Sequence, residues 1–89
     1  MQDLVKARTR IDELDKKLVD IFKLRFSLLQ EIAIYKKKEN LPIYDELREL
    51  EILNRNVAYL NDESLSSYFK EFYKSLLHVS KEYQKDIIK

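Results

Sequence analysis

An apolar repeat with helical spacing runs through the first part of the chain without a break. From Leu4 to about Lys38, apolar residues recur at the spacing of one helix face, and neither Gly nor Pro interrupts them. This pattern predicts a single long helix. At ~1.5 Å per residue its length is on the order of 50 Å, well beyond the ~30 Å diameter of a small domain. The rest of the chain is too short to cover such a helix, so we expect a second copy of the chain to lie along it.

The repeat can be written as heptads, which separates its apolar residues into two neighbouring phases of one seam. The first phase holds Leu4, Ile11, Leu18 and Ile32, and the second holds Ala7, Leu14, Ile21, Leu28 and Tyr35. This arrangement is typical of a helix that pairs with another helix. It predicts an intertwined helical homodimer.

The chain contains no Gly and a single Pro, which favours helices over tight hairpin turns. Pro42 predicts that the first helix ends near Glu39 or Asn40, because the residue before a proline is disfavoured in the helical region. Asp45 is suited to cap a second helix that continues to about Leu60. A polar turn follows over residues 61–64, and a third helix is predicted from about Ser64 to Ile87.

The second and third helices each carry a predicted inner face. The expected inward residues are Leu47, Leu50, Leu53, Val57 and Leu60, then Leu65, Phe69, Phe72, Tyr73, Leu76, Leu77 and Val79. The sequence thus predicts an all-α fold with three helices per chain, and no repeat or linker divides residues 1–89 into more than one domain.

Composition narrows the possible functions. The chain has no Cys and only one His, His78, so we expect neither disulfides nor a zinc motif. The 17 Lys and Arg nearly balance the 16 Asp and Glu, so no global charge attracts nucleic acid or an anionic membrane. No segment is long and apolar enough to suggest a signal peptide or a membrane span. These features predict a cytoplasmic protein without a metal cofactor.

Charged residues interrupt the apolar seam of the long helix. Arg25 falls in the heptad phase of Leu18 and Ile32, and Lys36 lies about three turns further along the same face. Two such cations can converge on one small anion. The alternative interpretation is that Arg25 forms a structural ion pair and that the lysines at residues 36–38 are a solvated basic run. Arg8 is on the order of 42 Å from Lys36 along the helix, so it could reach that site only from an antiparallel partner chain.

Polar residues also gather on the other two helices. Asp45, Arg48 and Glu49 fill the first turn of the second helix, where free backbone N–H groups favour anions. Helix capping with an exposed ion pair is the alternative interpretation. Ser80 and Gln84 are four residues apart and continue the inner face of the third helix, so they need partners unless that helix frays or bonds across a dimer.

Taken together, these residues include cations, one acidic acceptor and one amide donor, without a nucleophile and base pair. Such a set suits the binding and electrostatic stabilisation of an anion, and it does not suit covalent catalysis.

Several stretches of the chain resemble the all-helical chorismate mutases, which occur free or fused to other shikimate-pathway enzymes. The resemblance rests on A-R-T-R-I-D-E-L-D-K-K-L, L-R, I-A-I-Y-K, L-P-I-Y-D-E-L-R-E and S-x-x-x-Q, which begin at residues 7, 24, 32, 41 and 80. It covers essentially the whole chain, and the combined spacing is specific. It implies a cofactor-free isomerase that converts chorismate to prephenate in aromatic amino acid biosynthesis.

The resemblance also implies roles for eight residues. By position, Arg25 and the Arg8 of a partner chain correspond to the substrate-binding arginines, and Lys36 to the catalytic lysine. The residues that hold the substrate hydroxyl or line and complete the pocket correspond to Asp45, Arg48, Glu49, Ser80 and Gln84. Lys36, Gln84 and Arg25 are the expected catalytic residues.

Two other functions remain possible for such a fold. One is a lyase that eliminates pyruvate from isochorismate, although the presence of both Asp45 and Glu49 favours the mutase. The other is a catalytically silent helical dimerisation or regulatory module, in which the basic residues would be paired with acids and would leave no pocket.

Overall fold

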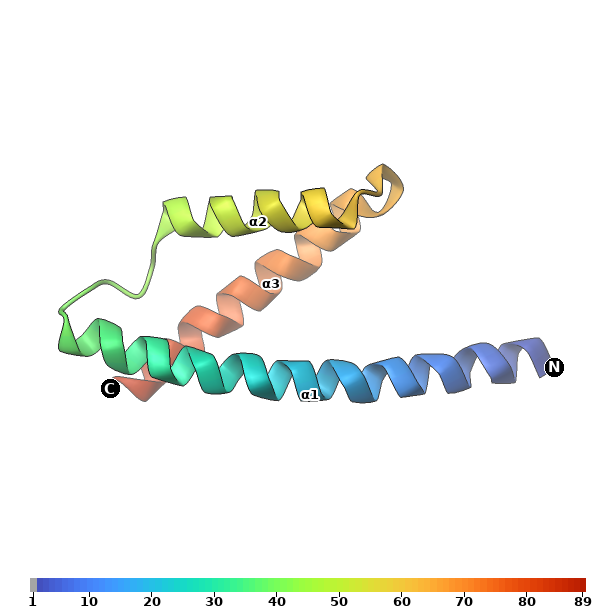
Figure 1. Cartoon of the computed structure of the whole chain (residues 1–89), viewed down its shortest axis with the longest axis horizontal. Coiled ribbons are helices and arrows are strands. Elements are labelled where there is room, and N and C mark those ends of the chain that lie inside the picture. The colour runs from blue at the N-terminus through green and yellow to red at the C-terminus, as the bar shows by residue number, and fades with distance from the viewer. Residues whose placement is uncertain (1) are drawn as a thin grey trace.

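The computed structural model describes residues 2–89, which form three α-helices in the order α1, α2 and α3 (Figure 1). Helix α1 spans Gln2–Lys38, α2 spans Glu46–Leu60 and α3 spans Glu63–Ile87. The prediction of an all-α chain with a long first helix is confirmed. Helix α3 begins just before the expected Ser64, because Asp62 caps it by accepting a hydrogen bond from the backbone N–H of Ser64 at 3.0 Å.

The connections that end α1 and α2 both use an asparagine in the left-handed conformation. Asn40 has a φ of 58° and Asn61 a φ of 46°, values that asparagine tolerates better than most residues other than glycine. After α1 the N–H of Leu41 donates to the carbonyl of Lys36 at 2.8 Å, and the N–H of Asn40 donates to that of Lys37 at 3.2 Å. This is a Schellman motif, so α1 stops just before Pro42 without a glycine.

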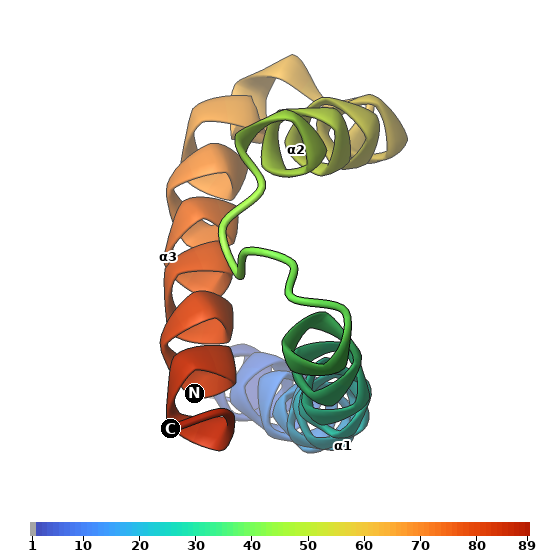
Figure 2. The same ribbon diagram turned by 90° about the vertical axis from the view of Figure 1, so that its left-hand side faces the viewer.

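Helix α3 connects the other two helices. It packs against both α1 and α2, whereas no described Cα atom of α1 comes within 8 Å of one of α2. Figure 2 shows α1 and α2 on the same side of α3, one near each of its ends. Helices α1 and α2 therefore pack on α3 and not on each other.

The molecule is elongated, with principal extents of 56 × 26 × 16 Å. Its length is that of α1, whose N-terminal part continues past the other two helices in Figure 1. The apolar core is small and consists of Leu29, Ala33, Leu53 and Leu77. Phe26 of α1 adds a contact with Tyr83 of α3, with ring centroids 5.0 Å apart.

Several apolar residues that were expected to face inward are exposed. They are Leu47, Leu50, Leu65, Phe72 and Val79. For the single chain this part of the prediction is wrong. Helix α2 has only α3 against it, α3 meets each of the other helices along part of its length, and a helix face needs a neighbour to become buried. The apolar seam of α1 is exposed along the helix, and Leu18 and Leu28 are about half exposed. Among the described residues, none of the helices is both long and apolar enough to cross a membrane.

Candidate active site

A cleft of about 580 Å³ lies between the three helices and the loop that precedes α2. This volume is within the range of small-molecule sites. Its apolar wall is formed by Leu28, Leu29, Ile32, Ile43, Ile52, Tyr73 and Leu77. Its polar wall contains seven of the eight residues singled out from the sequence, namely Arg25, Lys36, Asp45, Arg48, Glu49, Ser80 and Gln84.

Arg25 of α1 is held in the cleft by Ser80 of α3. Its Nη1 donates a hydrogen bond to Ser80 Oγ, which in turn donates to the carbonyl of Leu76 at 2.6 Å. Ser80 is only 3% exposed. The partner of Arg25 is therefore a neutral hydroxyl and not the acidic residue of the alternative interpretation. The hydroxyl fixes the position of the guanidinium and does not neutralise its positive charge.

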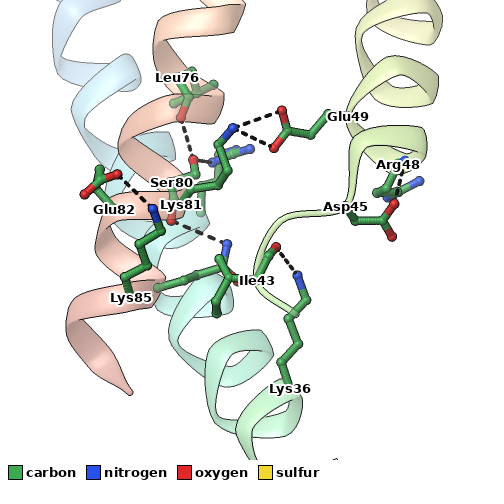
Figure 3. Close-up of polar contacts among 12 residues, drawn as sticks. Lys36, Ile43, Asp45, Arg48, Glu49, Leu76, Ser80, Lys81, Glu82 and Lys85 are labelled. Carbon is green, nitrogen blue, oxygen red and sulfur yellow. Dashed lines mark hydrogen bonds and ion pairs between the residues drawn. The ribbon is translucent and has the colours of Figure 1, made fainter. Parts of the chain in front are cut away.

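Lys36 lies at the other end of the α1 segment that borders the cleft. Its Nζ donates to the carbonyl of Ile43 at 2.9 Å, as Figure 3 shows. An ammonium has three N–H donors, so this bond fixes its position and leaves donors for a ligand. Lys37 differs, because it is exposed and reaches the carbonyl of Ile88 at 3.3 Å.

The first turn of α2 combines helix capping with two different ion pairs. Asp45 Oδ1 accepts from the backbone N–H of Arg48 at 3.0 Å, and the Arg48 guanidinium is exposed and pairs with Glu51 at 3.2 Å. The capping interpretation is therefore correct for Asp45. Glu49 differs from both, because its carboxylate points across the cleft toward α3 (Figure 3).

Lys81 of α3 is a polar wall residue that the sequence analysis missed. Its Nζ lies 3.2 Å from Glu49 Oε2 and 4.4 Å from the centroid of the Tyr44 ring. Its position directly after Ser80 was the one available signal, but helical spacing alone does not predict a contact between α2 and α3. Arg55 was also missed, and it lines the cleft while pairing with Glu51.

Gln84 is 5% exposed and incompletely bonded. Its Nε2 donates to the carbonyl of Ser80 at 3.4 Å, and its Oε1 is buried without a hydrogen-bond partner among residues 2–89. Leaving a buried amide oxygen without a partner costs about 1–3 kcal/mol. Gln84 also lines the cleft, and its Nε2 has a second N–H that can donate to a ligand there.

Arg8 is the predicted site residue that does not line the cleft. It is exposed on the N-terminal part of α1, which extends away from the other helices (Figure 1). The chain thus brings seven of the predicted residues together by itself and leaves the eighth outside.

The charges around the cleft favour an anion. The cationic residues Arg25, Lys36, Arg48, Arg55 and Lys81 line it, against the acidic Asp45 and Glu49. The local excess of positive charge is larger than the net charge of +1 of the whole chain. No group of three or more His, Asp or Glu side chains in the described part of the chain is placed to hold a metal ion. Fold and cleft together define an all-helical domain with a mainly cationic cleft of metabolite size.

Comparison with known proteins agrees with this class and gives the family. The chorismate mutase type II family matches residues 7–85. A bifunctional chorismate mutase/prephenate dehydratase of Aquifex aeolicus (strain VF5) is 32% identical over 82 residues, which cover 92% of this chain and 22% of that protein. No solved structure matches the chain. The chain belongs to the chorismate mutase type II family, and a chorismate mutase is an isomerase.

Proposed function

We propose that the cleft binds chorismate and converts it to prephenate by a Claisen-type rearrangement, as a step in aromatic amino acid biosynthesis. One observation carries the proposal: cations, a carboxylate and a buried amide from three different helices line one cleft of a size suited to a metabolite. The reaction breaks one C–O bond and forms one C–C bond within a single molecule. It requires neither a cofactor nor a general base, so orientation and electrostatic stabilisation are sufficient.

In this proposal the arginines orient the substrate. Chorismate carries two carboxylates, and its flexible enolpyruvyl arm must fold over the ring before it can react. Arg25 binds one carboxylate from within the cleft, with Ser80 holding the guanidinium in place. A guanidinium suits this task because its fork of N–H donors matches a carboxylate. Asp45 and Arg48 shape the cleft at the start of α2.

Lys36 and Gln84 stabilise the charge that develops during the reaction. As the C–O bond lengthens, the ether oxygen gains negative charge, and the ammonium of Lys36 and the amide of Gln84 donate hydrogen bonds to it. Donors that are fixed before the reaction need no reorganisation in the transition state. The bond from Lys36 to Ile43 supports the first assignment, and Gln84 Nε2 has a second N–H besides the one that donates to Ser80, which supports the second. Glu49 accepts a hydrogen bond from the ring hydroxyl.

The second carboxylate is assigned to Arg8 of a second copy of the chain. The exposed apolar seam around Arg8 supports this part of the proposal, because a continuous apolar patch of that length is unusual on a monomer. A pair of antiparallel α1 helices would bring each Arg8 to the cleft of the other chain and would create two equivalent sites. In this proposal residues 1–89 form one chorismate mutase domain of a cytoplasmic homodimer.

Turnover of chorismate by the purified chain tests the proposal. We expect loss of chorismate absorbance with prephenate as the product, and no release of pyruvate from isochorismate in a parallel assay. Release of pyruvate from isochorismate without chorismate turnover would instead identify the lyase. If neither substrate reacts and a dicarboxylate transition-state analogue does not raise the melting temperature, the chain is a silent helical module.

A further inference from the structure

Lys81 forms a bridge across the cleft that the proposed mechanism does not use. Its ammonium lies 3.2 Å from one oxygen of Glu49 and 3.3 Å from the other, so one cation on α3 contacts both oxygens of a carboxylate on α2 (Figure 3). The side chains are 25% and 23% exposed, respectively. The other ion pairs of the described chain are more exposed and join neighbours on the same helix or at its end.

Tyr44 holds Lys81 from a second side. The ammonium lies 4.4 Å from the centroid of the Tyr44 ring, within the range of a cation–π contact. Tyr44 belongs to the loop between α1 and α2, so the loop, α2 and α3 all meet at this lysine. A flexible lysine that is fixed by two partners loses its freedom when the chain folds, and the carboxylate that it holds is then already oriented when a ligand arrives.

We propose that Lys81 is a positioning residue that holds the Glu49 carboxylate in place to accept the hydrogen bond of the substrate's ring hydroxyl. The inference rests on the proposed function. A carboxylate has about four acceptor positions, so contacts with one ammonium leave room for a hydroxyl donor. Without Lys81, Glu49 is free to rotate toward another cation of the cleft, such as Arg25 of α1.

Direct binding of a substrate carboxylate by Lys81 is the rival role, and the two roles differ in what they require of the ligand. The positioning role acts only through Glu49 and only on a ligand that has the ring hydroxyl. The direct role requires neither Glu49 nor the ring hydroxyl of the ligand. The test therefore compares chorismate with an analogue that lacks the ring hydroxyl but keeps both carboxylates and the enolpyruvyl ether.

The experiment measures kcat/KM for both compounds with the wild type, Lys81→Met, Lys81→Arg, Glu49→Gln and the double variant Lys81→Met/Glu49→Gln. We expect Lys81→Met to lower kcat/KM on chorismate about tenfold, a coupling of the usual size for a contacting charged pair. Lys81→Arg should restore most of the loss. In the Glu49→Gln background, and on the analogue, Lys81→Met should change kcat/KM less than about twofold.

Lys85→Met is the matched control, because Lys85 is on the same helix, pairs with Glu82 and does not line the cleft. It should behave as wild type with both compounds. Tyr44→Leu is a second variant in case Lys81→Met does not fold, since it leaves the ion pair intact and removes the ring. It should lower activity on chorismate about threefold and leave the analogue unaffected, whereas Tyr44→Phe should be neutral.

Three results would overturn the inference: unchanged activity of Lys81→Met on chorismate, additive losses in the double variant, or an equal loss on the analogue. The last two would assign Lys81 to direct binding of the substrate. Failure of the proposed function is a separate outcome, because it would appear as absent chorismate turnover in the wild type and in Lys85→Met alike.

Discussion

The two halves of α1 continue one apolar seam, which is exposed in both, but only the C-terminal half buries the face beside it. In the C-terminal half, Leu29 is 8% and Ala33 0% exposed, and the adjoining Arg25 and Lys36 each have a hydrogen-bond partner. In the N-terminal half, Leu18 is 51% exposed, and none of the described residues of α2 or α3 extends alongside the first turns (Figure 1).

This difference shows that one chain provides only part of what its sequence pattern requires. A helix pattern specifies which face must be covered but not which segment covers it. Each large apolar side chain left in water forgoes about 1.5–3 kcal/mol of stabilisation. The uncovered seam therefore favours association with a second copy. Substitutions in each half of α1 can show whether both halves contribute to one site.

The largest effect is expected in the C-terminal half, at Lys36. Lys36→Ala removes the proposed donor to the ether oxygen and should lower kcat about 10²-fold or more, by analogy with the loss of one oxyanion donor. Steady-state kinetics with chorismate measure this. Lys38→Ala removes a charge from the exposed end of the same basic run and should leave kcat unchanged. Near-normal turnover by Lys36→Ala would refute its assigned role.

Gln84→Glu should make activity depend on pH. An ionised carboxylate opposes the developing negative charge, whereas a protonated one can still donate a hydrogen bond, so activity should fall as the pH rises through the pKa of the new carboxyl. The pKa of a glutamic acid is about 4.3 in water, and burial raises it. We expect a loss of about 10²-fold at pH 8 that is largely recovered near pH 5. A profile that follows the wild type, or that of the exposed control Gln30→Glu, would reject the contact.

Arg8 tests the N-terminal half directly. Arg8→Ala should lower kcat/KM about 30-fold, since a charge-assisted bond to a carboxylate contributes about 1.5–3 kcal/mol. The neighbouring Arg10→Ala is the control and should have little effect, because Arg10 is exposed and has no role in the proposed site. Equal kinetics of the two variants would confine the site to the cleft of a single chain.

The smallest effect is on stability, and it compares two leucines of the same helix. Leu29→Ala should cost about 2–4 kcal/mol, because it leaves a cavity in the core of the chain. Leu18→Ala should cost about 1–3 kcal/mol if a second copy covers it, and less than about 0.5 kcal/mol if it stays in water. Thermal unfolding over a range of protein concentrations decides between these, because the melting temperature of a dimer rises with concentration.

The sequence was sufficient for the helices because their ends are set locally. Pro42 with Asn40 ends α1, and the caps Asp45 and Asp62 begin the next two helices. The cleft residues of α1 could be found because a charge in an apolar seam is conspicuous. Their grouping with Asp45, Arg48, Glu49, Ser80 and Gln84 followed from the predicted inner faces of the three helices, and the family resemblance gave each residue its role.

The contacts between helices could not be predicted in the same way. Lys81 meets Glu49 only because α3 approaches α2 at a particular angle, and no periodicity encodes that angle. The exposure of Leu47 and Phe72 could not be predicted either. A sequence pattern shows that a helix face is apolar, but it does not show whether the same chain covers that face.

Mixing two impaired variants tests most directly whether the cleft of one chain is completed by the other. Arg8→Ala and Arg25→Ala are each expected to be strongly impaired alone. A mixed dimer would contain one site with both arginines and one with neither, so random pairing after joint refolding should recover about a quarter of the wild-type activity. Activity of the mixture no higher than the mean of the two separate variants would contradict the shared site.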